Sequence, residues 1–196
     1  MFQVRIHGRG GQGVVTAAEL LSLAAFGEGR YAQAFPSFGS ERTGAPVVSF
    51  CRIDDRPIRT REPIAEPDAV IVQDVTLVHQ VDLFAGLRPS GYVLLNTTKS
   101  FEELGLAELL DRFPAGRLVT VAATELALEE IGRPLPNAVL LGAFAALTGM
   151  ISLDGVASAI RERFAGEVAA ANVSAATRAA AQVRAAREEQ VGARAD

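Results

Sequence analysis

Six residues near the start of the chain, from Gly8 to Gly13, have the composition of a phosphate-binding turn. Three glycines among them, Gly8, Gly10 and Gly13, fit the spacing Gly-x-Gly-x-x-Gly. Such a turn reverses the chain tightly, lets a ligand or a partner's backbone approach closely, and leaves unpaired N–H groups at a helix N-terminus, which favour anions. The same spacing also serves to pack a helix closely on a strand. The motif therefore leaves two interpretations open, a bound anion and close packing.

A dinucleotide site requires an acidic residue in addition to the glycines. That residue stands at the end of the second strand, about 20 residues on, where it binds the ribose hydroxyls. The predicted second strand, residues 31–35, is followed by Pro36, while Glu28 stands before it and Glu41 lies deep in the next loop. A Walker loop is absent too, because no Gly-Lys-Ser/Thr follows the glycines. A stand-alone Rossmann-type nucleotide-binding oxidoreductase is thus an alternative hypothesis that depends on the glycines alone.

The other residue types that carry chemistry are few. His7 lies beside the glycine turn, where it either faces a site or is a satisfied polar residue at a strand end, and His79 has no Cys or His partner at ligand spacing. Cys51 is the single cysteine and lies in an apolar run, so we expect a buried structural thiol in a reducing compartment. One cysteine cannot hold an iron–sulfur cluster or a thiolate zinc site by itself. We therefore expect no catalytic residue and no metal on this chain, with the chemistry carried by partners.

The elements that position the glycine turn alternate between strands and helices. An apolar strand over 2–7 precedes the turn, a helix over 13–26 follows it, and the strand over 31–35 completes a βαβ unit whose two strands should pair in parallel. Later strands are predicted at 45–54, 58–60, 68–74, 91–96 and 117–123. Later helices are predicted at 76–84, 101–113, 124–131 and 138–149. Thr76 should cap the first of these and Asn137 the last, which should end at Gly149. A further short helix should begin after Ser152, and an Ala-rich helix at about residue 167.

This order of elements predicts the fold class α/β. We expect a Rossmann-like, doubly wound, mostly parallel but mixed sheet with a helical C-terminal third. Residues 1–165 should form the α/β domain, and residues 166–196 an Ala-rich helix packed on it or on a partner. That helix also leaves open a third hypothesis, a structural adaptor from another complex, although Ala is simply the best helix former.

The composition of the chain favours some classes of protein and argues against others. The chain has 196 residues, of which 49% are hydrophobic and 21% charged, enough apolar material for one domain with a sizeable core. Its net charge of −4 argues against non-specific nucleic-acid binding. No secretory signal and no uninterrupted run of about 18 apolar residues occurs, so we expect a cytoplasmic protein without a membrane span.

Three motifs in order resemble those of a known family. Residues 7–18, His-Gly-Arg-Gly-Gly-Gln-Gly-Val-Val-Thr-Ala-Ala, closely resemble the opening of the gamma subunit of 2-oxoacid:ferredoxin oxidoreductases. Residues 35–50, which contain Ser-Phe-Gly-Ser-Glu-Arg-Thr-Gly-Ala-Pro, resemble the family's loop and following strand, and residues 136–144, Pro-Asn-Ala-Val-Leu-Leu-Gly-Ala-Phe, resemble its late helix. The resemblance covers residues 2 to about 160.

The resemblance implies a subunit of a larger enzyme. Enzymes of this family oxidatively decarboxylate a 2-oxoacid, such as pyruvate or phenylglyoxylate, with coenzyme A to acyl-CoA and CO2. Alpha and beta subunits hold thiamine diphosphate with Mg, and [4Fe-4S] clusters lie on beta and on a ferredoxin-like delta subunit. Ferredoxin, or NAD through an additional flavoprotein with FAD, accepts the electrons. The gamma chain has no cofactor of its own, and the 2-oxoacid and the acceptor stay open.

The resemblance also implies contact residues, because coenzyme A docks near the gamma subunit in this family. Arg9, Arg42 and the helix start would suit a pyrophosphate. We expect the following residues to contact coenzyme A or the neighbouring subunits: Gly8, Arg9, Gly10, Gly11, Gln12, Gly13, Ser40, Glu41, Arg42, Thr43, Gly44 and Asn137.

Overall fold

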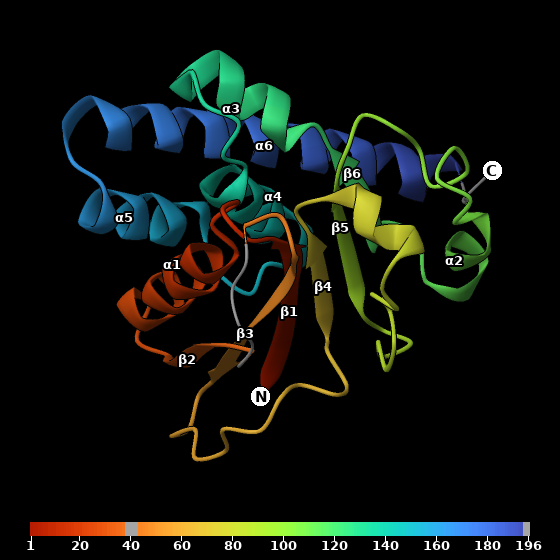
Figure 1. Cartoon of the computed structure of the whole chain (residues 1–196), viewed down its shortest axis with the longest axis horizontal. Helices are drawn as coiled ribbons and strands as arrows, with labels where there is room; N and C mark the ends of the chain where they lie inside the picture. The colour runs from red at the N-terminus through yellow and green to blue at the C-terminus, as the bar shows by residue number, and fades with distance from the viewer. Residues whose placement is uncertain (38–42, 194–196) are drawn as a thin grey trace.

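A computed structural model describes residues 1–37 and 43–193, and a six-stranded mixed sheet lies at its centre (Figure 1). The strands are β1 Phe2–Arg9, β2 Tyr31–Pro36, β3 Pro46–Asp54, β4 Ala69–Val72, β5 Tyr92–Asn96 and β6 Leu118–Val121. The helices are α1 Val14–Gly27, the 3₁₀ helix η1 Val75–His79, α2 Ala107–Arg112, α3 Ala123–Ile131, α4 Asn137–Thr148, α5 Leu153–Arg163 and α6 Gly166–Ala193. The predicted α/β class, with a mixed sheet and a helical C-terminal region, is confirmed.

The strands lie in the order β2-β3-β1-β4-β5-β6. β1, β4, β5 and β6 are parallel neighbours, whereas β3 is antiparallel to both β1 and β2. The prediction that residues 31–35 pair directly with β1 is therefore wrong, because β3 lies between them. The physical reason is burial: β3 is buried from Ser49 to Ile53, while no residue of β2 is fully buried. The more apolar strand takes the interior position, and β2 becomes the edge.

The two faces of the sheet are covered differently. α1, α4, α5 and α6 build the larger core on one face, where α4 packs on β5 and β6 and α6 packs over α4 (Figure 1). The smaller core on the other face is built by β4, β5, η1, α2 and the loops around them. α4 is apolar on all sides because it lies between the sheet and α6. Among the described helices, none combines the length and the apolar composition needed to cross a membrane.

Several local predictions need correction. Asp74, rather than Thr76, caps the turn after β4, because its Oδ1 accepts the Thr76 N–H at 3.0 Å, and a 3₁₀ turn ends at His79 where a helix to residue 84 was expected. Of the helix predicted over 101–113, only α2 forms, since Gly105 adopts a positive φ of 71° just before it. Residues 58–60 form no strand.

The ends of the late helices follow the predicted residues, with one exception. Gly149 ends α4 in the left-handed conformation, and the Ser152 hydroxyl caps α5 by accepting the Gly155 N–H at 2.9 Å, both as predicted. Pro136, however, occupies the N-cap position of α4, so Asn137 is its first helical residue. The Asn137 side chain instead accepts the N–H of Ala138 at 2.9 Å.

Candidate functional site

The glycine turn leaves the carboxyl end of β1, where the strand order reverses, with β2 and β3 on one side of β1 and β4 to β6 on the other. In open α/β sheets, ligands bind at this kind of switch point. The turn is tied to the end of the loop before β3, because Gly10 donates to the Ala45 carbonyl at 2.9 Å and Gly44 donates to the Gly10 carbonyl at 3.0 Å. Gly10 also forms an isolated bridge with Thr43. Two separate predicted segments thus meet, while Ser40, Glu41 and Arg42 lie outside the described residues.

The glycines of the motif have different structural roles. A Cβ on Gly8 would lie 2.7 Å from the Val14 side chain, so this glycine allows α1 to pack closely on β1. Gly13 has a positive φ of 73° and precedes α1, and a Cβ there would lie 2.5 Å from Asn137 Nδ2. The contact places Asn137, at the start of α4, against the turn. Gly11 also has a positive φ, 92°, but a Cβ on it would meet no described atom within 4 Å.

A polar network braces the turn from the side of β4. Asp74 Oδ2 accepts from Gln12 Nε2 at 2.8 Å and from Arg9 Nε at 3.2 Å, and Gln12 Oε1 accepts the Arg9 N–H at 2.7 Å. The Arg9 guanidinium also donates to the Gly44 carbonyl, the Thr76 hydroxyl and Gln80 Oε1. Four of the five N–H groups of the Arg9 guanidinium therefore donate within the chain, and this side chain holds the turn in place.

The network also sets the charge state of Asp74. Partial burial alone would raise the pKa of this carboxyl, but hydrogen bonds from Thr76 and Gln12, together with the charge of Arg9, lower it below its usual value. The carboxylate is thus ionised at neutral pH and neutralises Arg9. Asp74 was absent from the expected contact residues, although its position as an acid ending an apolar strand was visible in the sequence.

A shallow hollow of about 220 Å³ lies over the turn and the start of α1. It is lined by Arg9, Gly10, Gly11, Gly13, Val14, Val15 and Val47. Within the described residues, no side chain caps the N-terminus of α1. The first-turn N–H groups of this helix therefore have no side-chain acceptor, which favours a carbonyl or an anionic oxygen from outside the chain.

Two buried polar residues lie near the turn: Gln73, which was not singled out from the sequence, and His7, which was. Gln73 is 2% exposed, and neither atom of its side-chain amide has a hydrogen-bond partner among the described residues. Its Cβ lies 3.2 Å from the position that a Cβ on Gly8 would take. His7 is 7% exposed, its Nε2 has no described partner, and it does not line the hollow. Burial, helped by the nearby Arg5 charge, lowers the pKa of His7 to about 4, so its imidazole is neutral at pH 7.

The dinucleotide hypothesis fails on strand order as well as on residue type. In a dinucleotide fold, the acid that binds the ribose ends the parallel strand beside β1 on the side of the first crossover. In this chain β3 occupies that position and runs the opposite way, with Pro46 opposite Arg9. β2 ends at Pro36 one strand further out.

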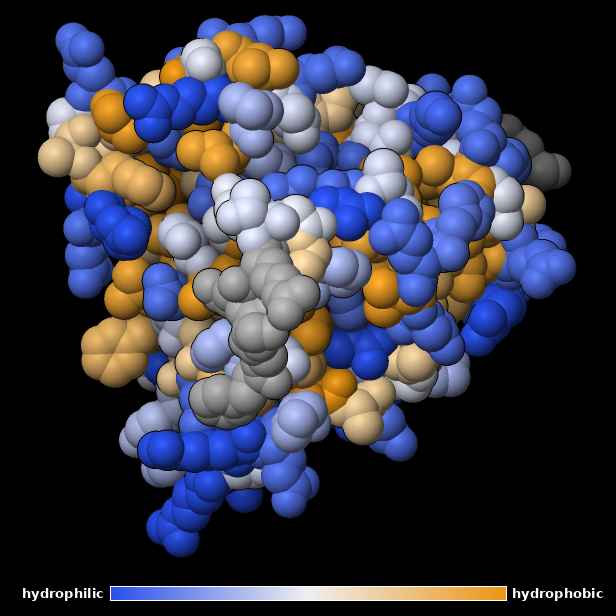
Figure 2. Space-filling view, in the orientation of Figure 1, coloured by the Kyte–Doolittle hydropathy of each residue, from blue (hydrophilic) through white to orange (hydrophobic). Residues whose placement is uncertain are grey.

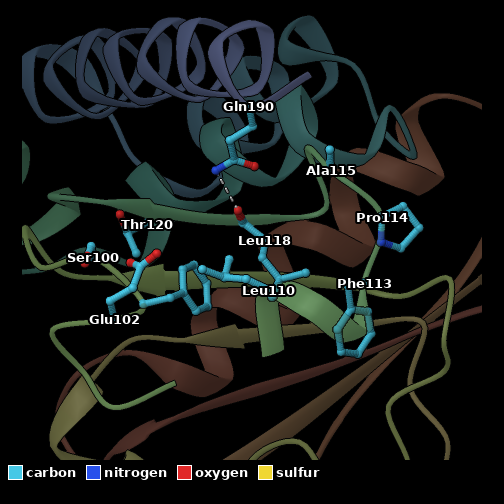
Figure 3. Close-up of a pocket in the computed structure, with 10 residues that line it drawn as sticks. Ser100, Glu102, Leu110, Phe113, Pro114, Ala115, Leu118, Thr120 and Gln190 are labelled. Atoms are coloured by element: carbon cyan, nitrogen blue, oxygen red, sulfur yellow. Dashed lines mark hydrogen bonds between the residues drawn. The ribbon is translucent and has the colours of Figure 1, made fainter. Parts of the chain in front are cut away.

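A second pocket, of about 310 Å³, lies along the free edge of β6 (Figure 3). Figure 3 shows Leu110, Phe113 and Leu118 on one side and Ser100, Glu102 and Thr120 on the other. Gln190, from α6, reaches across and donates to the Leu118 carbonyl at 3.1 Å. Glu102 is the one titratable side chain among the lining residues, so this pocket has no acid–base pair.

Comparisons with known proteins place the chain among subunits of one class of oxidoreductase. The profile of the family described as pyruvate ferredoxin/flavodoxin oxidoreductase matches residues 3–182. The chain is 51% identical to the pyruvate/ketoisovalerate oxidoreductases common subunit gamma of Thermococcus kodakarensis, over 91% of this chain and 95% of that one. It is 49% identical to the pyruvate synthase subunit PorC of Methanothermobacter marburgensis, over 90% and 94%. The crystal structure of the pyruvate oxidoreductase subunit PORC of Thermotoga maritima superposes with a TM-score of 0.77, at 38% identity over 92% and 95%.

Proposed function

This chain belongs to the pyruvate ferredoxin/flavodoxin oxidoreductase family as a gamma subunit, and from that premise we propose its role in the complex. It serves as a non-catalytic subunit of an enzyme that oxidatively decarboxylates a 2-oxoacid with coenzyme A, using thiamine diphosphate and iron–sulfur clusters held by partner subunits. Pyruvate is the first substrate to test, because the relatives' names include pyruvate.

The potential metal ligands of this chain support the assignment of the cofactors to partner subunits. The described residues contain no group of three His, Cys, Asp or Glu side chains that could hold a metal ion. Cys51 is fully buried, and burial raises the pKa of its thiol, so it is neither a nucleophile nor a cluster ligand. Neither a [4Fe-4S] cluster nor the Mg of thiamine diphosphate fits these donors, and we assign the Mg to the alpha and beta subunits and the clusters to the beta and delta subunits.

The braced glycine turn is the observation that supports a binding role. Arg9, Gln12 and Asp74 hold the turn rigidly, while a Cβ on Gly11 would meet no described atom and no described side chain caps the start of α1. A rigid turn with free N–H groups and no Cβ accepts a close approach by a diphosphate or by a partner's backbone. We assign the hollow to coenzyme A or to a neighbouring subunit, with main-chain N–H groups rather than the Arg9 side chain as the donors.

Anaerobic co-purification tests the subunit assignment. The native chain should purify with subunits that carry thiamine diphosphate and iron–sulfur clusters, and the complex should reduce ferredoxin only when a 2-oxoacid and coenzyme A are both present. A chain that purifies alone from its native source, under conditions that keep the clusters intact, would contradict the assignment.

A pair of glycine variants tests the hollow. Gly11 and Gly29 both have positive φ angles, 92° and 80°, and a Cβ on either would meet no described atom within 4 Å. Alanine at either position therefore costs a similar conformational strain of about 1–2 kcal/mol. In the assembled enzyme, Gly11→Ala should raise the KM for coenzyme A about tenfold, equivalent to about 1.4 kcal/mol, while Gly29→Ala leaves it unchanged.

The remaining outcomes of the glycine pair separate the two candidate contacts. If Gly11→Ala weakens assembly and leaves the KM for coenzyme A unchanged, the hollow faces a subunit. If both variants leave assembly and KM as in the wild type, the hollow binds neither, and the turn serves only to pack α1 on β1.

A further inference from the structure

The segment between β3 and β4, residues 55–68, contains no helix or strand. Loops longer than about 12–15 residues without secondary structure are uncommon in compact domains, and those that occur are usually either functional or disordered. This loop projects from the lower end of the molecule in Figure 1. β3 is antiparallel to β1, so the loop leaves the sheet at the edge opposite to the glycine turn.

The second half of the loop is anchored to the body of the protein. The Glu62 carbonyl accepts from Arg52 Nη2 at 2.5 Å, and the Glu66 carbonyl accepts from Gln3 Nε2 at 3.2 Å. Ile64 between them is 3% exposed. A Cβ on Gly86 would overlap the Ala65 carbonyl, so a second loop packs directly against this one. The base of the loop therefore has a defined position.

The first half of the loop presents three arginines. Arg56, Arg59 and Arg61 are all exposed, and in the described part of the chain none of them makes a side-chain hydrogen bond or an ion pair. Asp55 at the start of the loop is already paired with Arg30 at 3.1 Å. Ile58 lies between the arginines and is half-buried. Figure 2 shows this end of the molecule as strongly hydrophilic.

Residues 56–61 contain these three arginines and no acid, between Asp55 and Glu62, whereas the whole chain has a net charge of −4. Arginine is enriched at protein–protein interfaces, where its planar guanidinium binds carboxylates bidentately. We infer that residues 55–61, the arginine loop, dock onto an acidic surface of a neighbouring subunit of the oxidoreductase complex. The inference rests on the proposed function, since it requires that complex to exist. It places this contact at the opposite edge of the sheet from the hollow over the glycine turn.

The small number of positive charges and the fixed base of the arginine loop favour a protein subunit as the partner that it binds. A short cluster of three arginines on an acidic chain is too small an electrostatic footprint for non-specific nucleic-acid binding. A loop fixed at its base before binding loses little conformational entropy on docking, which favours a permanent contact between subunits. Opposite charges on the two surfaces would speed assembly and set its orientation.

Competitive assembly tests the arginine loop. The wild-type chain and the triple variant Arg56→Gln, Arg59→Gln, Arg61→Gln are expressed together with tagged thiamine-binding subunits, and mass spectrometry measures their ratio in the purified complex. The matched control replaces Arg133, Arg161 and Arg184, which are exposed and free of ion pairs within the described residues, by Gln. Isolated variant chains should melt within about 2 °C of the wild type, because surface substitutions change stability little.

The expected result is a selective, salt-dependent defect. At about 50 mM NaCl the loop variant should enter the complex about tenfold less than the wild type, while the control enters equally. At about 0.5 M NaCl the difference should shrink, because salt screens the charges. Equal incorporation of the loop variant at low salt, or an equal defect in the control, would overturn the inference while the proposed function stands. Failure of the wild-type chain to enter any such complex would remove both.

Discussion

Asp74 accepts four hydrogen bonds, two of them from residues of the glycine turn, and removing its charge provides the sharpest test of that geometry. Oδ1 accepts from the Thr76 N–H at 3.0 Å and from its hydroxyl at 2.6 Å, and Oδ2 accepts from Gln12 Nε2 at 2.8 Å and Arg9 Nε at 3.2 Å. In Asp74→Asn, the remaining oxygen can still accept from Thr76. The new NH2 group then faces two donors, Gln12 and Arg9, and can accept from neither.

The size of the effect follows from those two lost contacts. A hydrogen bond to a charged group contributes about 1.5–3 kcal/mol, and the side chain of Asp74 is 16% exposed, so water compensates for part of the loss. We expect the free energy of unfolding to fall by about 2–3 kcal/mol at pH 7. For a chain of this length, that loss lowers the Tm by about 4–12 °C.

Urea unfolding and calorimetry across a pH series are the assays. Folding lowers the pKa of Asp74 below the unfolded value of about 3.9, so between the two values the unfolded state binds the extra proton. The stabilisation is therefore fully present above about pH 5 and is lost as the pH falls through the folded pKa. The stability gap between the wild type and Asp74→Asn should be constant at neutral pH and close in acid.

Asp55→Asn is the matched control, because the side chain of Asp55 is 83% exposed and its ion pair with Arg30 is at the surface. It should change the free energy of unfolding by less than about 0.5 kcal/mol. If Asp74→Asn is as stable as the wild type at pH 7, or its deficit does not close in acid, the carboxylate does not brace the turn.

Two further substitutions test the core and the buried histidine. In Gly142→Ala, the new Cβ would overlap the carbonyl oxygen of Ala176 and lie 2.6 Å from its carbon, so α4 and α6 must separate. Urea unfolding should show a loss of about 3 kcal/mol or more, while Gly192→Ala, which meets no described atom, should be neutral or stabilise by up to about 1 kcal/mol. Equal stability of the two variants would contradict the close helix contact. His7, with its pKa lowered to about 4, should make the free energy of unfolding fall by up to about 3 kcal/mol as the pH drops from 6.5 to 4, because only the unfolded state binds the proton. His7→Gln should lack this slope, and an NMR titration of His7 near pH 6.5 would refute it.

Strand order shows where sequence patterns are insufficient. Each of the strands β1 to β6 lies in or next to a predicted apolar run, but adjacency along the chain suggested that β1 pairs with β2. Pairing depends on which strand buries more apolar surface at the centre of the sheet, and β3, with Phe50, Cys51 and Ile53 buried, takes that place. No short stretch of the sequence indicates which of these distant segments takes the central position.

The candidate site, too, could be predicted only in part from the sequence. The glycines, the helix after them and the family were predictable, because turn chemistry and motifs are local properties of neighbouring residues. The internal contacts of Arg9 were not: its guanidinium, expected to contact coenzyme A or a neighbouring subunit, also donates to Asp74, Thr76 and Gln80 within the chain. The contact of Thr43 and Gly44 with the turn was likewise invisible before folding.

By itself, then, the sequence determined the family, the α/β class and the position of the glycine turn, since each depends on residue types at fixed spacing along the chain. The tertiary structure alone decided that Arg9 braces this turn, and that among the described residues no atom lies close to a Cβ on Gly11 and no side chain caps α1. Asp74 lies 65 residues from Arg9, and only the parallel pairing of β1 with β4 brings the two together. Hydrogen bonds between such distant residues form only after the sheet has closed the intervening loop, and no local pattern predicts them.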